Sequence, residues 1–298
     1  MKVLAIDGGG IRGLIPALVL AEIERRSQRR IGELFDLVAG TSTGGIIACA
    51  LARPEPLSAD AIAAIYEQEG PLIFDRSLLR RIRSVDGLLD ERYDAAGLVA
   101  ALEHHLGGVR LAQAQPPVLL TAYDIERRRA VFLRSRHDDV TMVEAAHATS
   151  AAPTYFEPVR VNGTALVDGG VFATNPAVCA YAEVAGRLEL LVSLGTGEHT
   201  RPLQYERVRG WGKLEWAQPL IDVVFDGSSD AVDLQLGALL GDAYVRLQTP
   251  LDEASDDLDD ASPENLAALR REAKRLIAAR DDEIDRVCER LTSPPQVA

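Results

Sequence analysis

Two short apolar runs, each followed at once by a glycine-rich turn and then by a helix, constrain the fold more than any other feature of this 298-residue chain. The runs before the turns have the length and composition of buried strands, and the first helix shows apolar positions at helical spacing. The predicted strands cover residues 3–6 and 34–39, the turns 8–13 and 40–45, and the helices 14–30 and 46–52. A strand–turn–helix unit that occurs twice is typical of a parallel α/β sheet.

The rest of the chain is predicted to extend that fold as one domain, because no stretch changes composition as a linker would. Residues 1–200 are predicted to form the core, interrupted by a helical insertion at about 55–112, and residues 201–298 a helical completion of the same domain. The further elements expected are a hairpin of strands 118–124 and 130–134, a helix at 143–148, strands at 164–167 and 188–194, a helix from Asn175 to about 185, an acidic loop at 252–260 and a long helix at 263–291.

Charge and cysteine content exclude several classes of protein. The chain carries 32 Lys and Arg against 45 Asp and Glu, a formal net charge of −13, without a basic stripe that interleaves aromatic residues, so we expect no nucleic-acid partner. The three cysteines (Cys49, Cys179 and Cys288) are widely spaced, form no metal or redox motif and fit a reducing cytoplasm. Asp7 and three glycines interrupt the first apolar run, so no secretory signal is predicted, and no stretch approaches the roughly 20 apolar residues of a membrane span.

One segment departs from this acidic average. Residues 76–83 mix arginines with aliphatic side chains, which is typical either of an amphipathic surface helix or of a segment that contacts a membrane surface. We therefore expect a cytoplasmic protein that also lies peripherally at membranes.

The second turn, Gly40-Thr41-Ser42-Thr43-Gly44, has the Gly-x-Ser-x-Gly spacing of a nucleophile elbow. It lies between a predicted strand and a predicted helix, where a sharp turn lifts the serine hydroxyl out of the sheet and the glycines leave space around it. The helix N-terminus adds a positive dipole where negative charge develops during attack. Ser42 is therefore the candidate nucleophile, and a plain turn with a capping serine is the alternative.

A nucleophilic serine needs a base, and the sequence offers two. Asp168 stands at the end of a predicted strand before Gly169-Gly170, where open α/β sheets build their sites; burial there would raise its pKa toward that of a useful base. An ordinary turn aspartate is the alternative. His199 would complete the chain order Ser42, Asp168, His199 of an α/β-hydrolase, although its polar neighbours favour a surface position. The remaining histidines lie in polar, charged or helical stretches, the first two expected at the surface: His104, His105, His137 and His147.

The first turn, with Gly8, Gly9 and Gly10, is open to two interpretations. Its backbone N–H groups can bind the acyl oxygen of a substrate held on Ser42, because an oxyanion must come within about 3 Å of main-chain nitrogen. The same glycine pattern is also that of a dinucleotide site, which needs an acidic residue about 20 positions on, at the end of the next strand. The two glutamates near that distance lie in the predicted helix, and no phosphate-loop lysine is present, so the first interpretation is favoured.

Taken together, these residues resemble the patatin-like phospholipase family. The matching stretches follow one another over about residues 1–200 and are DGGGIRG at 7–13, GTSTGG at 40–45, ATSAAPTYFEPV at 148–159, DGG at 168–170 and VSLGTG at 192–197. The resemblance implies a three-layer α/β sandwich, in which helices flank a central, mostly parallel sheet.

The resemblance also implies a site and an activity. Ser42 and Asp168 would form a catalytic dyad without histidine, and the three glycines of the first turn would form the oxyanion hole. Arg12 would sit beside that loop as a weaker substrate contact, with an exposed arginine at a helix start as the alternative. The implied reaction is hydrolysis of carboxylic esters in acyl lipids, with transient membrane contact and with no metal or cofactor.

Two points stay open at this stage. Six large apolar side chains either pack in the core or form an acyl channel or lid: Leu72, Phe74, Leu78, Leu79, Trp211 and Trp216. The alternative function is a patatin-type effector with low basal activity, gated by a ligand or partner that binds the less matched C-terminal third. A dinucleotide-binding oxidoreductase is disfavoured for the reasons given above.

Overall fold

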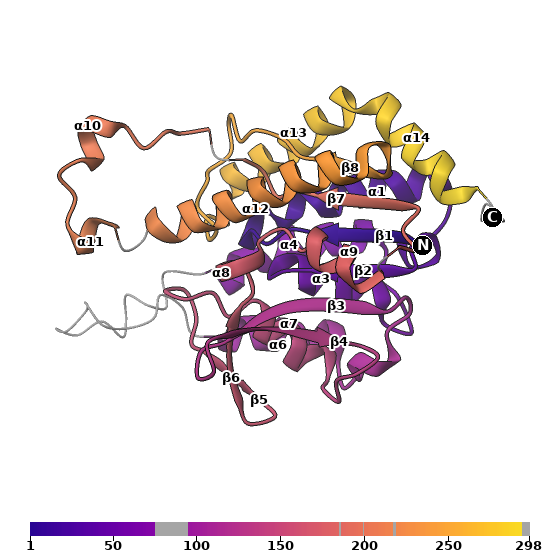
Figure 1. The fold of residues 1–298 in the computed structure, drawn as a ribbon, viewed down its shortest axis with the longest axis horizontal. Helices are drawn as coiled ribbons and strands as arrows, with labels where there is room; N and C mark the ends of the chain where they lie inside the picture. Colours follow the sequence, from indigo (N-terminus) through magenta and orange to yellow (C-terminus); the bar gives the residue numbers. More distant parts are fainter. Residues whose placement is uncertain (75–94, 185, 199, 217–218, 294–298) are drawn as a thin grey trace.

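The computed structural model describes residues 1–74, 95–184, 186–198, 200–216 and 219–293. Its described part forms an eight-stranded sheet with helices on both faces (Figure 1). The strand order is β5-β6-β3-β2-β1-β7-β8, with β4 paired to β3. The strands are β1 Lys2–Ile6, β2 Leu37–Gly40, β3 Val118–Asp124, β4 Arg129–Arg134, β5 Val159–Val161, β6 Thr164–Asp168, β7 Leu190–Leu194 and β8 Tyr244–Leu247.

Helices connect these strands and cover the sheet. On one face α1, α3 and α7 pack with α4, α6, α13 and α14, and on the other face α8, α9 and α12. The α-helices are α1 Leu14–Ser27, α2 Ile31–Leu34, α3 Thr43–Ala52, α4 Ala59–Ile73, α6 Ala96–Leu106, α7 Met142–Thr149, α8 Gly170–Ala173, α9 Ala177–Val184, α10 Tyr205–Val208, α11 Lys213–Trp216, α12 Pro219–Leu240, α13 Pro263–Ala279 and α14 Asp281–Thr292. Short 3₁₀ turns lie at η1 Gly10–Gly13, η2 Leu111–Gln113 and η3 Gly241–Ala243. The expected three-layer α/β architecture is confirmed.

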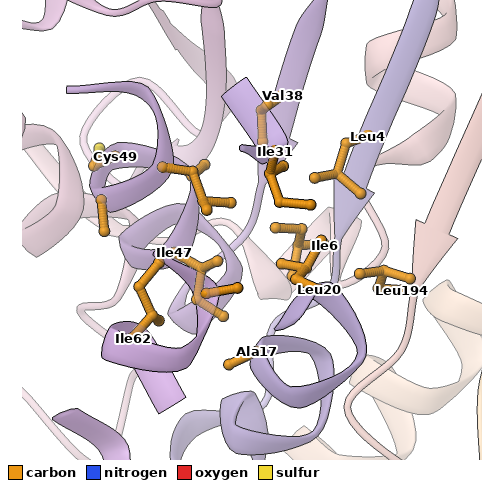
Figure 2. Close-up of a cluster of buried hydrophobic side chains, with 14 of the residues drawn as sticks. Leu4, Ile6, Ala17, Leu20, Ile31, Val38, Ile47, Cys49, Ile62 and Leu194 are labelled. Atoms are coloured by element: carbon orange, nitrogen blue, oxygen red, sulfur yellow. The ribbon is translucent and has the colours of Figure 1, made fainter. Parts of the chain in front are cut away.

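Alternation along the strands divides the core between the two faces, because successive side chains point to opposite sides of a sheet. Figure 2 shows Leu4, Ile6 and Leu194 from the strands gathered with Leu20 of α1 and Ile47 of α3. The intervening strand positions pack against α9 and α12 on the other face and form a smaller cluster: Val3, Ala5, Leu37, Ala39, Leu119 and Leu191 with Ala177, Ala180, Val184 and Leu236. The parallel strands are therefore buried on both faces, as such strands usually are.

The sheet is parallel at its centre and antiparallel at one side. β1 pairs in parallel with β2 and β7, β2 with β3, and β7 with β8, whereas β4 and β6 are antiparallel to β3 and β5 is antiparallel to β6. β4 occupies one edge of β3 along its length, so β2 and β6 share the other edge. They run toward each other there: Gly40 ends β2 opposite Leu120, and Asp168 ends β6 opposite Ala122. The turn after β2 and the end of β6 therefore meet.

Several predicted boundaries were wrong. The first helix ends at Ser27 because Gln28 takes a left-handed conformation with φ +55° and caps it. β2 starts only at Leu37, since residues 31–34 first form the helical turn α2, whose Ile31 and Leu34 are buried. The second helix already begins at Thr43. The long C-terminal helix is two helices, α13 and α14, separated at Arg280.

The C-terminal third contributes more than helices. β8 pairs with β7 and so extends the same sheet, where the sequence predicted only a helical completion. The 22-residue helix α12 precedes β8, and Figure 1 shows α10 and α11 standing away from the body of the protein beyond one end of α12. In the described part of the chain, no helix is both long and apolar enough to cross a membrane. The basic segment 76–83, with Leu78 and Leu79, and also His199 lie outside the described residues.

Candidate active site

Ser42 sits in a strained turn between β2 and α3. Its backbone has φ +54° and ψ −124°, a region that residues with a Cβ seldom adopt, and holding it there costs about 1–3 kcal/mol. Such strain persists only where the surroundings enforce it. The side chain is 8% exposed. The structure therefore places Ser42 in the conformation expected of a nucleophile elbow rather than of a capping serine: the side chain makes no cap hydrogen bond to α3.

Threonines hold this turn in place, and the sequence analysis had not singled them out. Thr149, at the end of α7, accepts the N–H of Ser42 at 3.0 Å and donates its hydroxyl to the Thr121 carbonyl at 2.6 Å. Thr41 shares a hydrogen bond of 2.7 Å with the Thr121 hydroxyl. Thr121 lies on β3 between the residue that pairs with Gly40 and the residue that pairs with Asp168. The hydrogen bonds therefore tie the turn at Ser42 to the strand along which the ends of β2 and β6 both lie.

Asp168 is fully buried at the end of β6. Its Oδ1 accepts the N–H of Gly170 at 2.7 Å, while Oδ2 has no partner of full hydrogen-bonding geometry in the described chain. Burial raises the pKa of Asp168 to about 7, and the hydroxyl of Ser42 acts in the opposite direction, which places it near the carboxyl. A carboxyl whose pKa lies near neutrality can take and return a proton at physiological pH.

The first glycine turn lies beside Ser42 and Asp168, and two of the three N–H groups expected as donors are free, within the described structure, to donate a hydrogen bond to a substrate. The N–H of Gly8 already donates to the Thr174 carbonyl at 3.0 Å, so it is not free to bind a substrate oxygen. For the N–H groups of Gly9 and Gly10 the described residues supply no acceptor. Gly10 has φ +56°, and a Cβ there would overlap the Leu258 carbonyl, so only glycine fits.

These groups open into one large apolar cavity. It encloses about 1040 Å³ of space not filled by protein atoms, open solvent at its mouth included, and Ser42, Asp168, Gly9 and Gly10 all line it. Its walls come from single faces of three helices and from neighbouring loops: Thr43, Ile46 and Ala50 of α3; Ile62, Ile65, Tyr66, Gly70 and Ile73 of α4; Leu98, Ala101, Leu102, His105 and Leu106 of α6; and Phe74, Tyr155, Phe156, Phe225 and Leu258. Polar groups are confined to a few positions in an apolar wall.

The large apolar residues that the sequence assigned either to the core or to an acyl channel or lid lie in several different places. Phe74 lines the cavity, whereas Leu72 is 70% exposed and belongs neither to the core nor to a channel. Trp211 and Trp216 are half-buried and pack edge to face, with ring centres 5.2 Å apart. The tryptophans thus contact each other and are not among the residues of the two core clusters.

The expectation that His105 is a surface residue was wrong. It is half-buried, it is the one described histidine that lines the cavity, and its Nε2 lies 2.6 Å from Oε1 of Glu69. Its carbonyl accepts from the guanidinium of Arg53, the residue that caps the C-terminal end of α3. His105 therefore contacts α4 through Glu69 and the C-terminal end of α3 through Arg53.

Arg12 lies beside the glycine turn and is buried, so it is not the exposed arginine of the alternative. It is 5% exposed, and it lines a second cavity, together with Gly8, Asp226 and Asp230, instead of the one that holds Ser42. Burial lowers the pKa of Arg12, whereas the charge of Asp226 raises it. Its Nε donates to the Gly9 carbonyl at 3.4 Å, so Arg12 helps to hold the glycine turn.

A buried ion pair supports the same turn from the C-terminal third. Arg246 on β8 donates to both carboxylate oxygens of Asp7, at 3.0 and 2.6 Å, and also to the hydroxyl of Ser193. Sequence reasoning missed Arg246 because it missed β8; the alternating strand YVRL was the available signal. Among the described residues, no group of three or more His, Cys, Asp or Glu could hold a metal ion.

Comparison with known proteins agrees with this geometry. Residues 4–181 match the sequence profile described as patatin-like phospholipase. Patatin-like protein 2 of Arabidopsis thaliana is 33% identical, over 93% of this chain and 83% of its own length, and Patatin-16 of Solanum tuberosum is 30% identical over the same shares. Another Solanum tuberosum relative, 30% identical, is named a probable inactive patatin. A crystal structure of VipD from Legionella pneumophila aligns with a TM-score of 0.44 and 12% identity, over 93% of this chain and 67% of that one. The profile match and the similarity along nearly the whole chain show that this protein belongs to the patatin-like phospholipase family.

Proposed function

We propose that this protein is a serine lipid acyl hydrolase that cleaves carboxylic esters through a Ser42–Asp168 dyad. Membership of the family supports a lipid-hydrolysing enzyme. Because one relative is named inactive, membership alone does not establish activity, and the proposal rests on the site itself. The observation that carries it is a fully buried Asp168 with a pKa of about 7, lining the same apolar cavity as the strained Ser42.

The chemistry follows from these groups. The carboxylate of Asp168 takes the hydroxyl proton of Ser42 while Oγ attacks the ester carbonyl carbon, and the N–H groups of Gly9 and Gly10 stabilise the oxyanion. The protonated Asp168 then gives its proton to the departing alcohol, which leaves an acyl group on Ser42. Water attacks that ester with Asp168 as base, the fatty acid departs, and the serine hydroxyl is restored.

The cavity favours an acyl chain of moderate length. The residues of α3 that line it extend as far as Ala50, eight positions beyond Ser42, which is about 12 Å along the helix. An extended hydrocarbon advances about 1.3 Å per carbon, from C–C bonds of about 1.5 Å, so a chain of about nine carbons would span that length. The substrate proposed is therefore an acyl lipid, reached by transient contact of a cytoplasmic protein with a membrane surface.

Hydrolysis of nitrophenyl esters tests the dyad. We expect Ser42→Ala and Asp168→Ala each to lose activity by at least about 1,000-fold, because each group takes part in the bond-making step. The matched control is Ser150→Ala: Ser150 lines the same cavity, but its hydroxyl donates to the Ala146 carbonyl at 2.6 Å, so this variant should remain active.

Other outcomes identify the alternatives. Loss of activity in His199→Ala together with retained activity in Asp168→Ala would replace the dyad by a histidine base. Wild-type protein that hydrolyses esters only after a ligand is added would favour the gated effector.

A further inference from the structure

Helix α12 buries polar as well as apolar side chains: Phe225 and Leu236 are buried against the protein, and carboxyls lie beside them. Asp222 and Asp226 lie on its half-buried side, where burial raises the pKa of both carboxyls and the charge of Arg12 lowers it. Ser229 on the same side donates to Asp7 at 3.3 Å. A surface helix normally exposes its charges, whereas these contacts draw polar side chains of α12 toward the protein.

The outward face of α12 is a long apolar strip. Its large aliphatic residues are exposed as follows: Leu220 51%, Val223 46%, Val224 41%, Leu234 74% and Leu239 70%. Exposed Gly227, Ala231 and Ala238 lie between them at helical spacing, so the strip extends for about 28 Å along the helix. Exposed apolar strips of this size mark contact sites, because leaving such surface in water is unfavourable.

We propose that this strip, the outer face of α12, docks on an anionic lipid surface, and this proposal rests on the proposed lipid hydrolysis. Phe225, on the buried side of the same helix, lines the cavity that holds Ser42. A lipid surface covering α12 therefore lies about one helix diameter, roughly 10 Å, from the catalytic cavity. The helix lies in the plane of the surface, since its opposite face packs on the protein and α12 does not qualify as a membrane span.

The segment that leads into α12 has the composition of a membrane interface. Residues 200–216 carry four cations and two acids, whereas the whole chain has a net charge of −13. Trp211 packs on Trp216 with Arg207 placed 5.8 Å over its ring, and Tyr205 is 71% exposed. Tryptophan, tyrosine and basic side chains concentrate where lipid headgroups meet water, and basic ones attract anionic lipids. The aromatic rings beside these basic side chains favour a lipid surface over a second copy of the chain.

Vesicle binding by the full-length protein tests the proposal. Sedimentation with vesicles of phosphatidylcholine and phosphatidylglycerol should show binding by the wild type and by Ser42→Ala alike. The double variant Leu234→Asp/Leu239→Asp should bind at least tenfold more weakly, because it places charge on two side chains that would enter the lipid. Its hydrolysis of a short soluble ester should be unchanged, which shows that it folds and keeps its site. The matched control is Ile125→Asp, an exposed aliphatic residue next to β3, which should bind as the wild type does.

Two results would overturn the proposal. One is equal vesicle binding by the double variant and the wild type. The other is a wild-type dimer that the double variant splits in light-scattering measurements while vesicle binding stays the same, which would assign the strip to a second copy. A wild type that binds vesicles yet hydrolyses no ester would refute the proposed function and leave the docking surface standing.

Discussion

Replacing Asp168 with asparagine should inactivate the protein and at the same time stabilise it at neutral pH. Asparagine keeps the shape of the side chain, and its Oδ1 can still accept the N–H of Gly170, a bond of 2.7 Å in the wild type. It has no charge to bury. The pKa of the native carboxyl rises from 3.8 to about 7 on burial, and this rise of about three pH units corresponds to about 4 kcal/mol of unfolding free energy.

Proton linkage gives the direction of this difference in unfolding free energy and the pH range over which it develops. Below about pH 4 the Asp168 carboxyl is protonated in both the folded and the unfolded protein, so removing its charge changes nothing. Between about pH 4 and pH 7 the unfolded carboxyl loses its proton and the folded one keeps it, so wild-type stability falls by about 1.4 kcal/mol per pH unit relative to the variant. Above about pH 7 the carboxyl is ionised in both the folded and the unfolded protein, and the unfolding free energy of the variant exceeds that of the wild type by the full amount of about 4 kcal/mol.

Urea unfolding at pH 5, 6, 7 and 8 measures this difference, and ester hydrolysis of the same samples measures activity. The control is Asp252→Asn, which makes the same substitution at an exposed aspartate. A folded Asp168→Asn protein that is no more stable than the wild type at pH 8 would show that the carboxyl is not buried as described. Retained hydrolysis would show that Asp168 is not the base.

Four further outcomes are expected. Ester hydrolysis (kcat/KM) should rise about tenfold per pH unit up to about pH 7 and then level off, since Asp168 acts as base only when ionised. Gly9→Ala should lower kcat by 100-fold or more, because its Cβ would overlap the side chain of Thr196 and displace the oxyanion loop; an unchanged kcat would remove that loop from the mechanism. Arg246→Met should lower the unfolding free energy, measured in urea, by about 3–5 kcal/mol, because it leaves a buried carboxylate unpaired. Ala101→Phe should move the preferred chain in a series of nitrophenyl esters toward shorter acyl groups, whereas an unchanged profile would place the chain elsewhere.

Much of the site could be predicted from the sequence because its local geometry depends on adjacent residues. A serine between glycines, at the end of an apolar strand and the start of a helix, predicts a strained elbow, and Ser42 has φ +54° there. The glycine turn and the Asp-Gly-Gly strand end could be recognised in the same way, since turns need particular residue types. The sequence did not predict that the N–H of Gly8 is taken by a carbonyl distant in the chain.

Other features depend on pairing between distant segments. β2 and β6 meet end to end along β3, and only this register brings Ser42 and Asp168 into one cavity and so raises the pKa of the carboxyl. The partner of Asp7 lies 239 residues away, on a strand that the sequence analysis missed.

The sequence by itself determined the first two strand–turn–helix units, the elbow and the candidate residues Ser42 and Asp168, because backbone preferences and side-chain periodicity act over a few residues. Tertiary structure alone decided burial and orientation. The sequence of α12 has apolar residues around most of the helix, and it does not show which of them is buried. That choice depends on the free energy of all groups packed against the helix: Phe225 and Leu236 are buried, and Arg12 and Asp7 draw Asp222 and Ser229 toward the protein beside them.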